Sequence, residues 1–133
     1  MESESDQKMM SFLETFYAQV REDEVLGDVF NKTINKWDSH LQKIEVFWKN
    51  HLYQPGLYKG NPLLIHQKLH EKEVLTESQF KRWLELFEST ADDFFQDKEL
   101  KSIKRKARMI GGTLYGRLLE KDLEVPGFNA FEV

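Results

Sequence analysis

The chain of 133 residues contains no cysteine. This absence excludes disulfides, thiolate metal sites, a cysteine nucleophile and a cofactor attached through thioether bonds. Basic residues are also outnumbered, because 19 Lys and Arg stand against 23 Asp and Glu, which gives a net charge of −4. A nucleic-acid backbone is best met by a basic protein face, so we expect no nucleic-acid partner.

Long apolar runs are equally missing, since no stretch approaches the length needed to cross a bilayer. The first six residues are acidic and polar, so we expect no export, no membrane partner and a cytoplasmic protein. The length fits one domain over residues 1–133, with an extension over about 1–7 and an irregular tail over about 122–133. There is no Gly-rich phosphate loop and no serine in a nucleophile turn, which argues against nucleotide-binding and hydrolase sites.

Glycine and proline are scarce, at seven and three residues, and apolar residues recur at helical spacing almost throughout, which predicts an all-α fold. Helices are expected over about 8–22, 25–30, 37–53, 62–69, 77–94 and 98–121, with a loop at 31–35. Asn61-Pro62 is typical of a helix start, and the segment 76–79, Thr-Glu-Ser-Gln, has the form of a capping box. Gly111 and Gly112 lie inside the last helix, where each glycine costs about 1 kcal/mol, so we expect a close packing contact there.

Four histidines are present, namely His40, His51, His66 and His70. Three of them share helix faces with apolar residues, where a charged ring would be costly, so we expect neutral rings that are hydrogen-bonded or bound to a metal. One such histidine alone is most often an ordinary core side chain.

The neighbours of these histidines favour heme over that simpler interpretation. Heme needs apolar and aromatic walls, one neutral imidazole for the iron and polar donors on the opposite side. Ten Phe, three Trp and four Tyr supply material for the walls. His66 lies among leucines on the short helix, His40 shares a face with Ile44 and Phe47, and Tyr17 is a phenol on an apolar face.

Six motifs in one order resemble the group III truncated hemoglobins. The segment from Tyr58 to His66 is similar to that family's Tyr-x-Gly-x-Pro-Leu-x-x-His element. The other five are Phe16-Tyr17, Leu26-Gly27 with Phe30, Trp37-x-x-His40, Phe47-Trp48, and Phe80-x-x-Trp83-Leu84-x-Leu86-Phe87. No single motif is decisive, but their joint order and spacing are specific. The resemblance implies a truncated globin fold, in which two helices stack on two others.

The resemblance also implies roles for individual residues. His66 would be the proximal ligand of the iron, and Tyr17 and Trp83 would donate hydrogen bonds to the bound ligand or water. His40 would be a distal gate or a third donor. The remaining implied heme contacts are Ile44 and Phe47 on the same helix as His40, Phe30 against the ring, Lys43 on a propionate and, as a weaker candidate, Arg82.

The register of the proximal ligand has one alternative. Counting forward from Pro62 favours His66. Counting backward from Trp83 favours His70 instead, because the interval between His66 and Trp83 is a few residues longer than in some members of the family. Both histidines lie on one helix face, and a one-turn slip moves the ring by about 5.4 Å. We prefer His66, because the helix start at Asn61-Pro62 fixes its register locally.

The resulting hypothesis is a heme b protein that reversibly binds oxygen, carbon monoxide or nitric oxide. Redox detoxification of reactive oxygen or nitrogen species would need an external reductase, because the sequence shows no reductase domain, so enzymatic activity stays open. Two alternatives are a His-x-x-x-His metal site formed by His66 and His70 and a cofactor-free helical interaction module. The basic run over residues 101–108 is interpreted as a solvated helix face.

Overall fold

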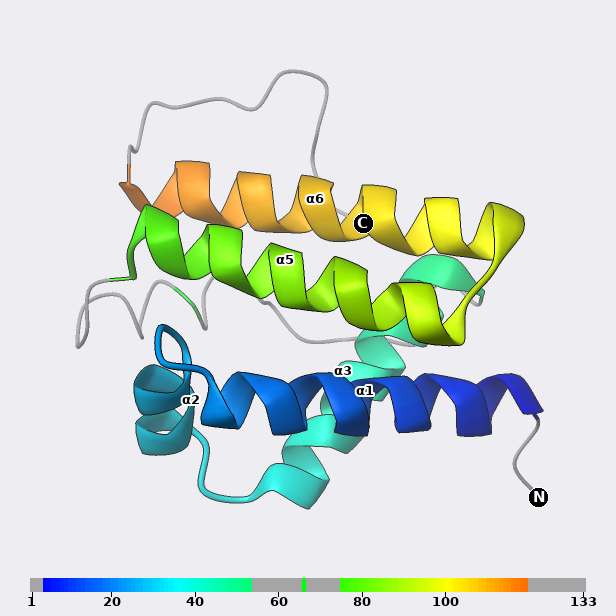
Figure 1. The fold of residues 1–133 in the computed structure, drawn as a ribbon, viewed down its shortest axis with the longest axis horizontal. Coiled ribbons are helices and arrows are strands. Elements are labelled where there is room, and N and C mark those ends of the chain that lie inside the picture. The colour runs from blue at the N-terminus through cyan, green and yellow to red at the C-terminus, as the bar shows by residue number, and fades with distance from the viewer. Residues whose placement is uncertain (1–3, 54–65, 67–74, 120–133) are drawn as a thin grey trace.

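The structure, a computed structural model, describes residues 4–53, 66 and 75–119. The described residues form helices without strands (Figure 1). The helices are α1 (Glu4–Glu22), α2 (Gly27–Thr33), α3 (Trp37–Leu52), α5 (Glu77–Phe94) and α6 (Asp97–Leu119). The all-α prediction is therefore confirmed, although α1 begins four residues earlier than expected. The predicted helix starting at Pro62 and the C-terminal tail lie outside the described residues.

The long helices form two layers. α5 and α6 run antiparallel to each other in one layer, and α1 and α3 cross in the other (Figure 1). α1 packs against α5 between the layers, and the short α2 packs against α1. This is the two-over-two arrangement that the sequence predicted. It places one face of α1 and one face of α3 opposite the start of α5.

The core between the layers is largely aromatic. Phe12 of α1 makes edge-on contacts with Phe87 at a ring-centroid distance of 5.0 Å and with Phe95 at 5.1 Å. All three rings are buried, and each contributes about 1.5–3 kcal/mol of transfer free energy. The apolar stripe predicted for α1 is buried in full, namely Met9, Leu13, Phe16, Tyr17 and Val20. Helical periodicity thus identified the buried face of α1 correctly.

The connection between α2 and α3 is shorter than predicted. We expected a loop at 31–35, but residues 31–33 belong to α2. The helix continues because the backbone N–H of Ile34 still donates to the carbonyl of Phe30 at 2.9 Å. An ion pair between Lys32 and Asp28 one turn apart adds a small stabilisation on the solvent side.

The capping box predicted before α5 is present. The Thr76 hydroxyl accepts from the backbone N–H of Gln79 at 3.2 Å, and the Gln79 side chain accepts from the backbone N–H of Thr76 at 2.9 Å. These reciprocal bonds satisfy two N–H groups that a helix start otherwise leaves without partners. They fix where α5 begins and hence the phase of Trp83 and Phe87 along it.

Gly27 allows a close approach of α2 to the end of α1. A Cβ atom at this position would lie 2.6 Å from the backbone oxygen of Arg21, closer than side-chain atoms can come without a shift. We therefore expect Gly27→Ala to lower the free energy of unfolding by about 1–3 kcal/mol, measured by urea denaturation followed by circular dichroism. A variant as stable as the parent would contradict this steric role.

Gly112 supplies the matched control, and it also corrects a prediction. We expected a close packing contact at the paired glycines. However, a Cβ at Gly112 would meet no atom of the described residues within 4 Å, and one at Gly111 would lie 4.0 Å from the Trp83 ring, an ordinary contact. Gly112→Ala should raise the free energy of unfolding by about 1 kcal/mol, because alanine favours the helix.

Within the described ranges, no helix has the length and apolar character that a membrane crossing requires.

Candidate functional site

A pair of aromatic side chains lies between α1 and α5. The Tyr17 side chain is buried, with 7% of its surface exposed, and Trp83 lies close enough to its hydroxyl to affect its pKa. Burial raises the Tyr17 pKa to about 12, and the neighbouring Trp83 side chain opposes that rise. Tyr17 is therefore a neutral phenol at physiological pH and can donate its proton.

The other neighbours of Tyr17 come from α2 and α3. Its ring centroid lies 6.0 Å from that of Phe30, 5.8 Å from that of Trp37 and 6.4 Å from that of His40. Three of the residues predicted for the distal side of a heme, Tyr17, Trp83 and His40, are thus brought together around one buried hydroxyl. They come from three different helices, so their proximity depends on the packing of α1, α3 and α5.

His40 is half-buried on α3. Burial lowers its pKa below the usual 6.5, and the charges of Lys43 and His66 lower the pKa further. A neutral imidazole at pH 7 follows, as expected from the sequence. The same effect shows that His66 lies close enough to His40 for their charges to interact.

The remaining predicted contacts on α3 continue the face that carries His40. Ile44 and Phe47 follow at helical steps and are half-buried against the core. The Phe47 ring packs against His51 with a centroid distance of 4.4 Å. Lys43 is exposed, which suits a side chain that meets a charged group at the surface.

Arg82 is held in ion pairs with two carboxylates. Its Nε donates to Asp23 at 2.8 Å and its guanidinium lies 3.2 Å from Glu85. The predicted contact between Arg82 and a propionate would therefore compete with Asp23. That contact stays a prediction, and Lys43 is the cation with a more accessible side chain.

Asp23 was not predicted as a residue of the site, yet its hydrogen bonds connect the turn before α2 to Arg82 on α5. One carboxylate oxygen accepts from Arg82, and the other accepts from the backbone N–H groups of Val25 at 3.0 Å and Leu26 at 3.1 Å. Asp23 thereby fixes the turn into α2, which carries Phe30, and connects it to α5. The sequence signals this role only by an aspartate shortly before the turn at Gly27. Nothing in the sequence indicates that Arg82, 59 residues away, is its partner.

We expect Asp23→Ala to lower the free energy of unfolding at pH 7 by about 1–2 kcal/mol, as loss of a helix-capping carboxylate does. Burial raises the Asp23 pKa, but the bonds from Arg82 and the two backbone N–H groups outweigh it, so the pKa lies below 3.8. A carboxyl group whose pKa is lowered by folding stabilises the folded protein at pH values above its pKa in the unfolded chain. This stabilisation is lost as the pH falls through its pKa in the folded protein. The difference between parent and variant should therefore shrink below about pH 3.8.

Urea denaturation at pH 7 and at pH 3 measures this difference. Asp28→Asn is the control, because Asp28 pairs only with the exposed Lys32 among the ion pairs recorded, and such pairs contribute little. An equal loss at both pH values in Asp23→Ala would contradict the charged role of Asp23.

The alternative metal site would be formed by His66 and His70. Among the residues that the structure describes, no group of three or more His, Asp or Glu side chains is placed to hold a metal ion. His70, the second member of the His-x-x-x-His pair and second choice for the iron ligand, lies outside those residues. The assignment of the iron to His66 therefore stays a prediction.

Three comparisons with known proteins agree with this geometry. Residues 5–111 match the family model of bacterial-like globins. A group 3 truncated hemoglobin of Campylobacter jejuni is 32% identical over 113 residues, which cover 82% of this chain and 87% of that protein. The crystal structure of a group III truncated hemoglobin from Campylobacter jejuni has a TM-score of 0.79 at 30% identity, and the match covers 91% of this chain and 96% of that one.

The matched region includes α1, α2, α3 and α5, and most of α6. It therefore spans every helix that contributes to the cluster around Tyr17. The chain belongs to the bacterial-like globin family and, within it, to the group III truncated hemoglobins.

Proposed function

We propose that this globin binds heme b, with His66 as the ligand of the iron and Tyr17, Trp83 and His40 on the opposite side. Globins normally bind heme, and the observation that carries the proposal here is the buried Tyr17 hydroxyl beside Trp83. Burying a phenol in an aromatic core is costly unless its polar group has partners. A polar ligand bound inside an apolar pocket would provide such a partner for the Tyr17 hydroxyl.

The side chains around this hydroxyl fit a flat apolar ligand with one polar side. Phe30, Ile44, Phe47 and Trp83 are large and apolar, yet each is only half-buried. Such partly exposed apolar surface next to a buried donor is typical of a ligand site. His66 would provide the imidazole for the iron, and it lies close enough to His40 for their charges to interact.

Bound heme supplies reversible binding of oxygen, carbon monoxide or nitric oxide at its iron. The chain's own residues determine how a polar ligand is held. If the Trp83 indole, which lies beside Tyr17, donates to the Tyr17 oxygen, the Tyr17 proton is left available to the ligand. The raised Tyr17 pKa keeps this proton in place throughout the physiological range.

His40 provides a second group with a defined protonation state. A neutral imidazole has one N–H donor and one acceptor, so His40 can donate to a ligand without placing a positive charge in the core. Lys43, one turn further along α3 and exposed, would meet a propionate at the surface. Reversible binding needs no more than these groups, whereas removal of nitric oxide or peroxide would also need electrons from a separate reductase.

Titration of the purified full-length protein with hemin tests the proposal. We expect a saturable one-to-one spectrum with an intense Soret band and, after reduction, binding of carbon monoxide. A titration without saturation would refute heme binding and favour a cofactor-free interaction module. Zinc or nickel that survives dialysis against a chelator would instead favour the His-x-x-x-His metal site.

A further inference from the structure

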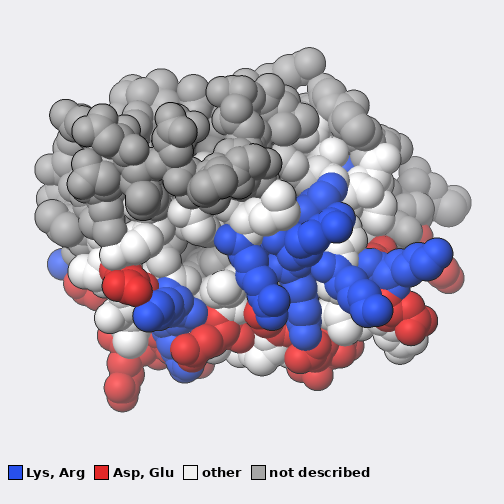
Figure 2. All heavy atoms as spheres, turned by 90° about the horizontal axis from the view of Figure 1, so that it is seen from above, with Lys and Arg blue, Asp and Glu red and all other residues white. Residues whose placement is uncertain are grey.

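Charge is unevenly distributed along this acidic chain. α6 carries seven basic and two acidic residues, a net charge of +5, whereas the rest of the chain carries 12 basic and 21 acidic residues, a net charge of −9. Seen from above in the view of Figure 1, most Lys and Arg side chains form one large cluster with Asp and Glu along its border, and a smaller group lies apart from it (Figure 2). A local charge opposite to that of the whole molecule orients a charged partner as it approaches.

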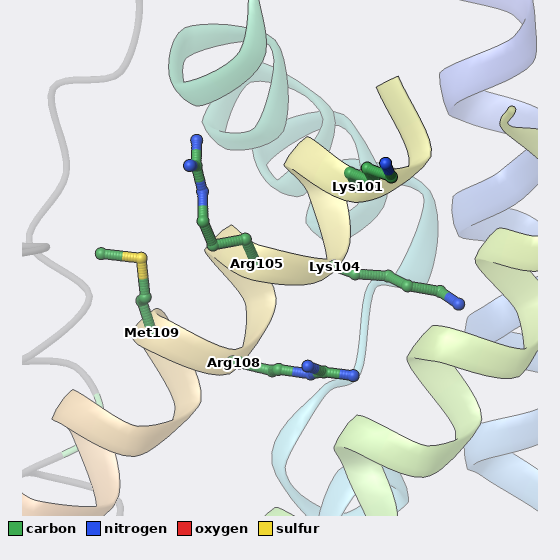
Figure 3. A pocket seen from close by; sticks show the side chains of 5 residues that line it. All are labelled: Lys101, Lys104, Arg105, Arg108 and Met109. Carbon is green, nitrogen blue, oxygen red and sulfur yellow. The ribbon is translucent and has the colours of Figure 1, made fainter. Parts of the chain in front are cut away.

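The cluster lines a hollow of about 420 Å³ on the surface of α6. Its lining residues, which we call the α6 basic surface, are Lys101, Lys104, Arg105, Arg108 and Met109 (Figure 3). Lys104 and Arg108 extend toward α5, whereas Arg105 and Met109 extend to the other side of the helix (Figure 3). The surface therefore combines cations with one long apolar side chain.

Two of the four cations are engaged within the protein. Lys104 pairs with Asp92 at 2.5 Å and Arg108 pairs with Glu88 at 2.8 Å, both across to α5. Among the described residues, no ion pair is recorded for Lys101 or Arg105. These two residues are exposed and lie one helical turn apart, so they offer two separate positive charges on one side of α6.

This arrangement favours a protein partner over a polymeric anion. Nucleic acid or an anionic membrane would also face the strongly acidic remainder of the chain, which would repel it. Two discrete cations match the discrete carboxylates of a protein surface. Met109 beside Arg105 adds the combination of Met and Arg that is enriched at protein interfaces.

The α6 basic surface also adjoins the proposed heme site. Lys106 lies next to Arg105 in the chain, and its amine donates to the backbone carbonyl of His51 at the end of α3. The His51 ring in turn packs on Phe47, one of the proposed heme contacts. A protein bound at this surface would therefore lie near the proposed heme site.

We propose that the α6 basic surface docks the carboxylate-rich face of a small acidic electron-carrier protein. The identity of the partner as an electron carrier rests on the proposed function, because a heme iron binds oxygen only in its reduced, ferrous state and an oxidised iron would need an electron to return to it. The docking itself rests on Lys101, Arg105 and Met109.

Calorimetric titration of the hemin-loaded full chain with an oxidised plant-type ferredoxin, an acidic electron carrier, tests the docking. An ionic strength of about 0.1 M limits charge effects to about 10 Å. We expect measurable binding that weakens at least tenfold in the double variant Lys101→Glu/Arg105→Glu. The matched control Lys32→Glu/Lys36→Glu makes the same change in net charge on exposed residues at the α2–α3 corner, and its affinity should change less than twofold.

Three results would overturn the docking proposal. These are no ferredoxin binding by the parent, equal weakening in both double variants, and tighter binding to phosphatidylglycerol vesicles or duplex DNA than to ferredoxin. The hemin titration is recorded separately for each variant. A normal Soret band without charge-dependent docking therefore refutes this inference alone, whereas a missing Soret band refutes the proposed function.

Discussion

Replacing His66 with alanine should abolish or severely weaken heme retention, while the helical fold persists. The imidazole would be the only protein ligand of the iron in the proposed site, so its loss removes the coordinate bond, and only apolar and surface contacts remain. Hemin titration followed at the Soret band measures the loss, and far-ultraviolet circular dichroism checks that the helices are intact.

His70→Ala is the control that decides the register, because His70 was the alternative ligand and lies one turn further along the same predicted helix. We expect this variant to keep a normal ferrous spectrum. The opposite result, with heme lost in His70→Ala and kept in His66→Ala, would move the ligand to His70. His51→Ala gives a second comparison, since His51 packs on Phe47 without a proposed bond to the iron.

The parts of the fold that could be predicted are those determined by local sequence. The start of α5 follows from a capping box that forms within four residues, and both of its hydrogen bonds are present. The buried stripe of α1 follows from the helical period, which depends only on backbone geometry. Such features need no knowledge of which helices pack together.

The features that were missed depend on contacts between distant segments. The ion pair between Asp23 and Arg82 joins residues 59 positions apart. Tyr53 likewise donates to Glu99 at 2.5 Å, and Glu99 also pairs with Lys8, which connects α3, α6 and α1. Neither set has a local pattern. The expected close contact at Gly112 is absent among the described residues, because a helix tolerates a glycine that costs about 1 kcal/mol even where no such neighbour requires it.

The candidate site could be predicted in part from local sequence and in part only from contacts between distant segments. Periodicity placed Tyr17 on a buried face and His40 on the same face as Ile44, but it could not bring α1, α3 and α5 together. The resemblance to truncated hemoglobins supplied that step. The structure adds a detail that neither provided, namely that Trp83 lies beside the Tyr17 hydroxyl and can act on it, whereas the resemblance implied that both residues donate to the bound ligand.

Replacing Tyr17 with phenylalanine should therefore speed oxygen dissociation from the ferrous protein about tenfold or more, since a hydrogen bond to a charged acceptor contributes about 1.5–3 kcal/mol. Stopped-flow displacement of oxygen by carbon monoxide measures the rate. In the parent the rate should stay constant from pH 7 to about pH 10, because the Tyr17 pKa is raised to about 12. An unchanged rate in Tyr17→Phe would remove Tyr17 from the ligand site.

Trp83→Phe then separates a positioning role from a direct one. If Trp83 acts by orienting the Tyr17 hydroxyl, the single variant should speed oxygen dissociation several-fold, and the change should add little in the Tyr17→Phe background. If Trp83 donates directly to the ligand, the two effects should multiply, because independent contributions add as free energies. We expect the first outcome, because the indole has a single N–H to donate and lies beside the buried Tyr17 hydroxyl.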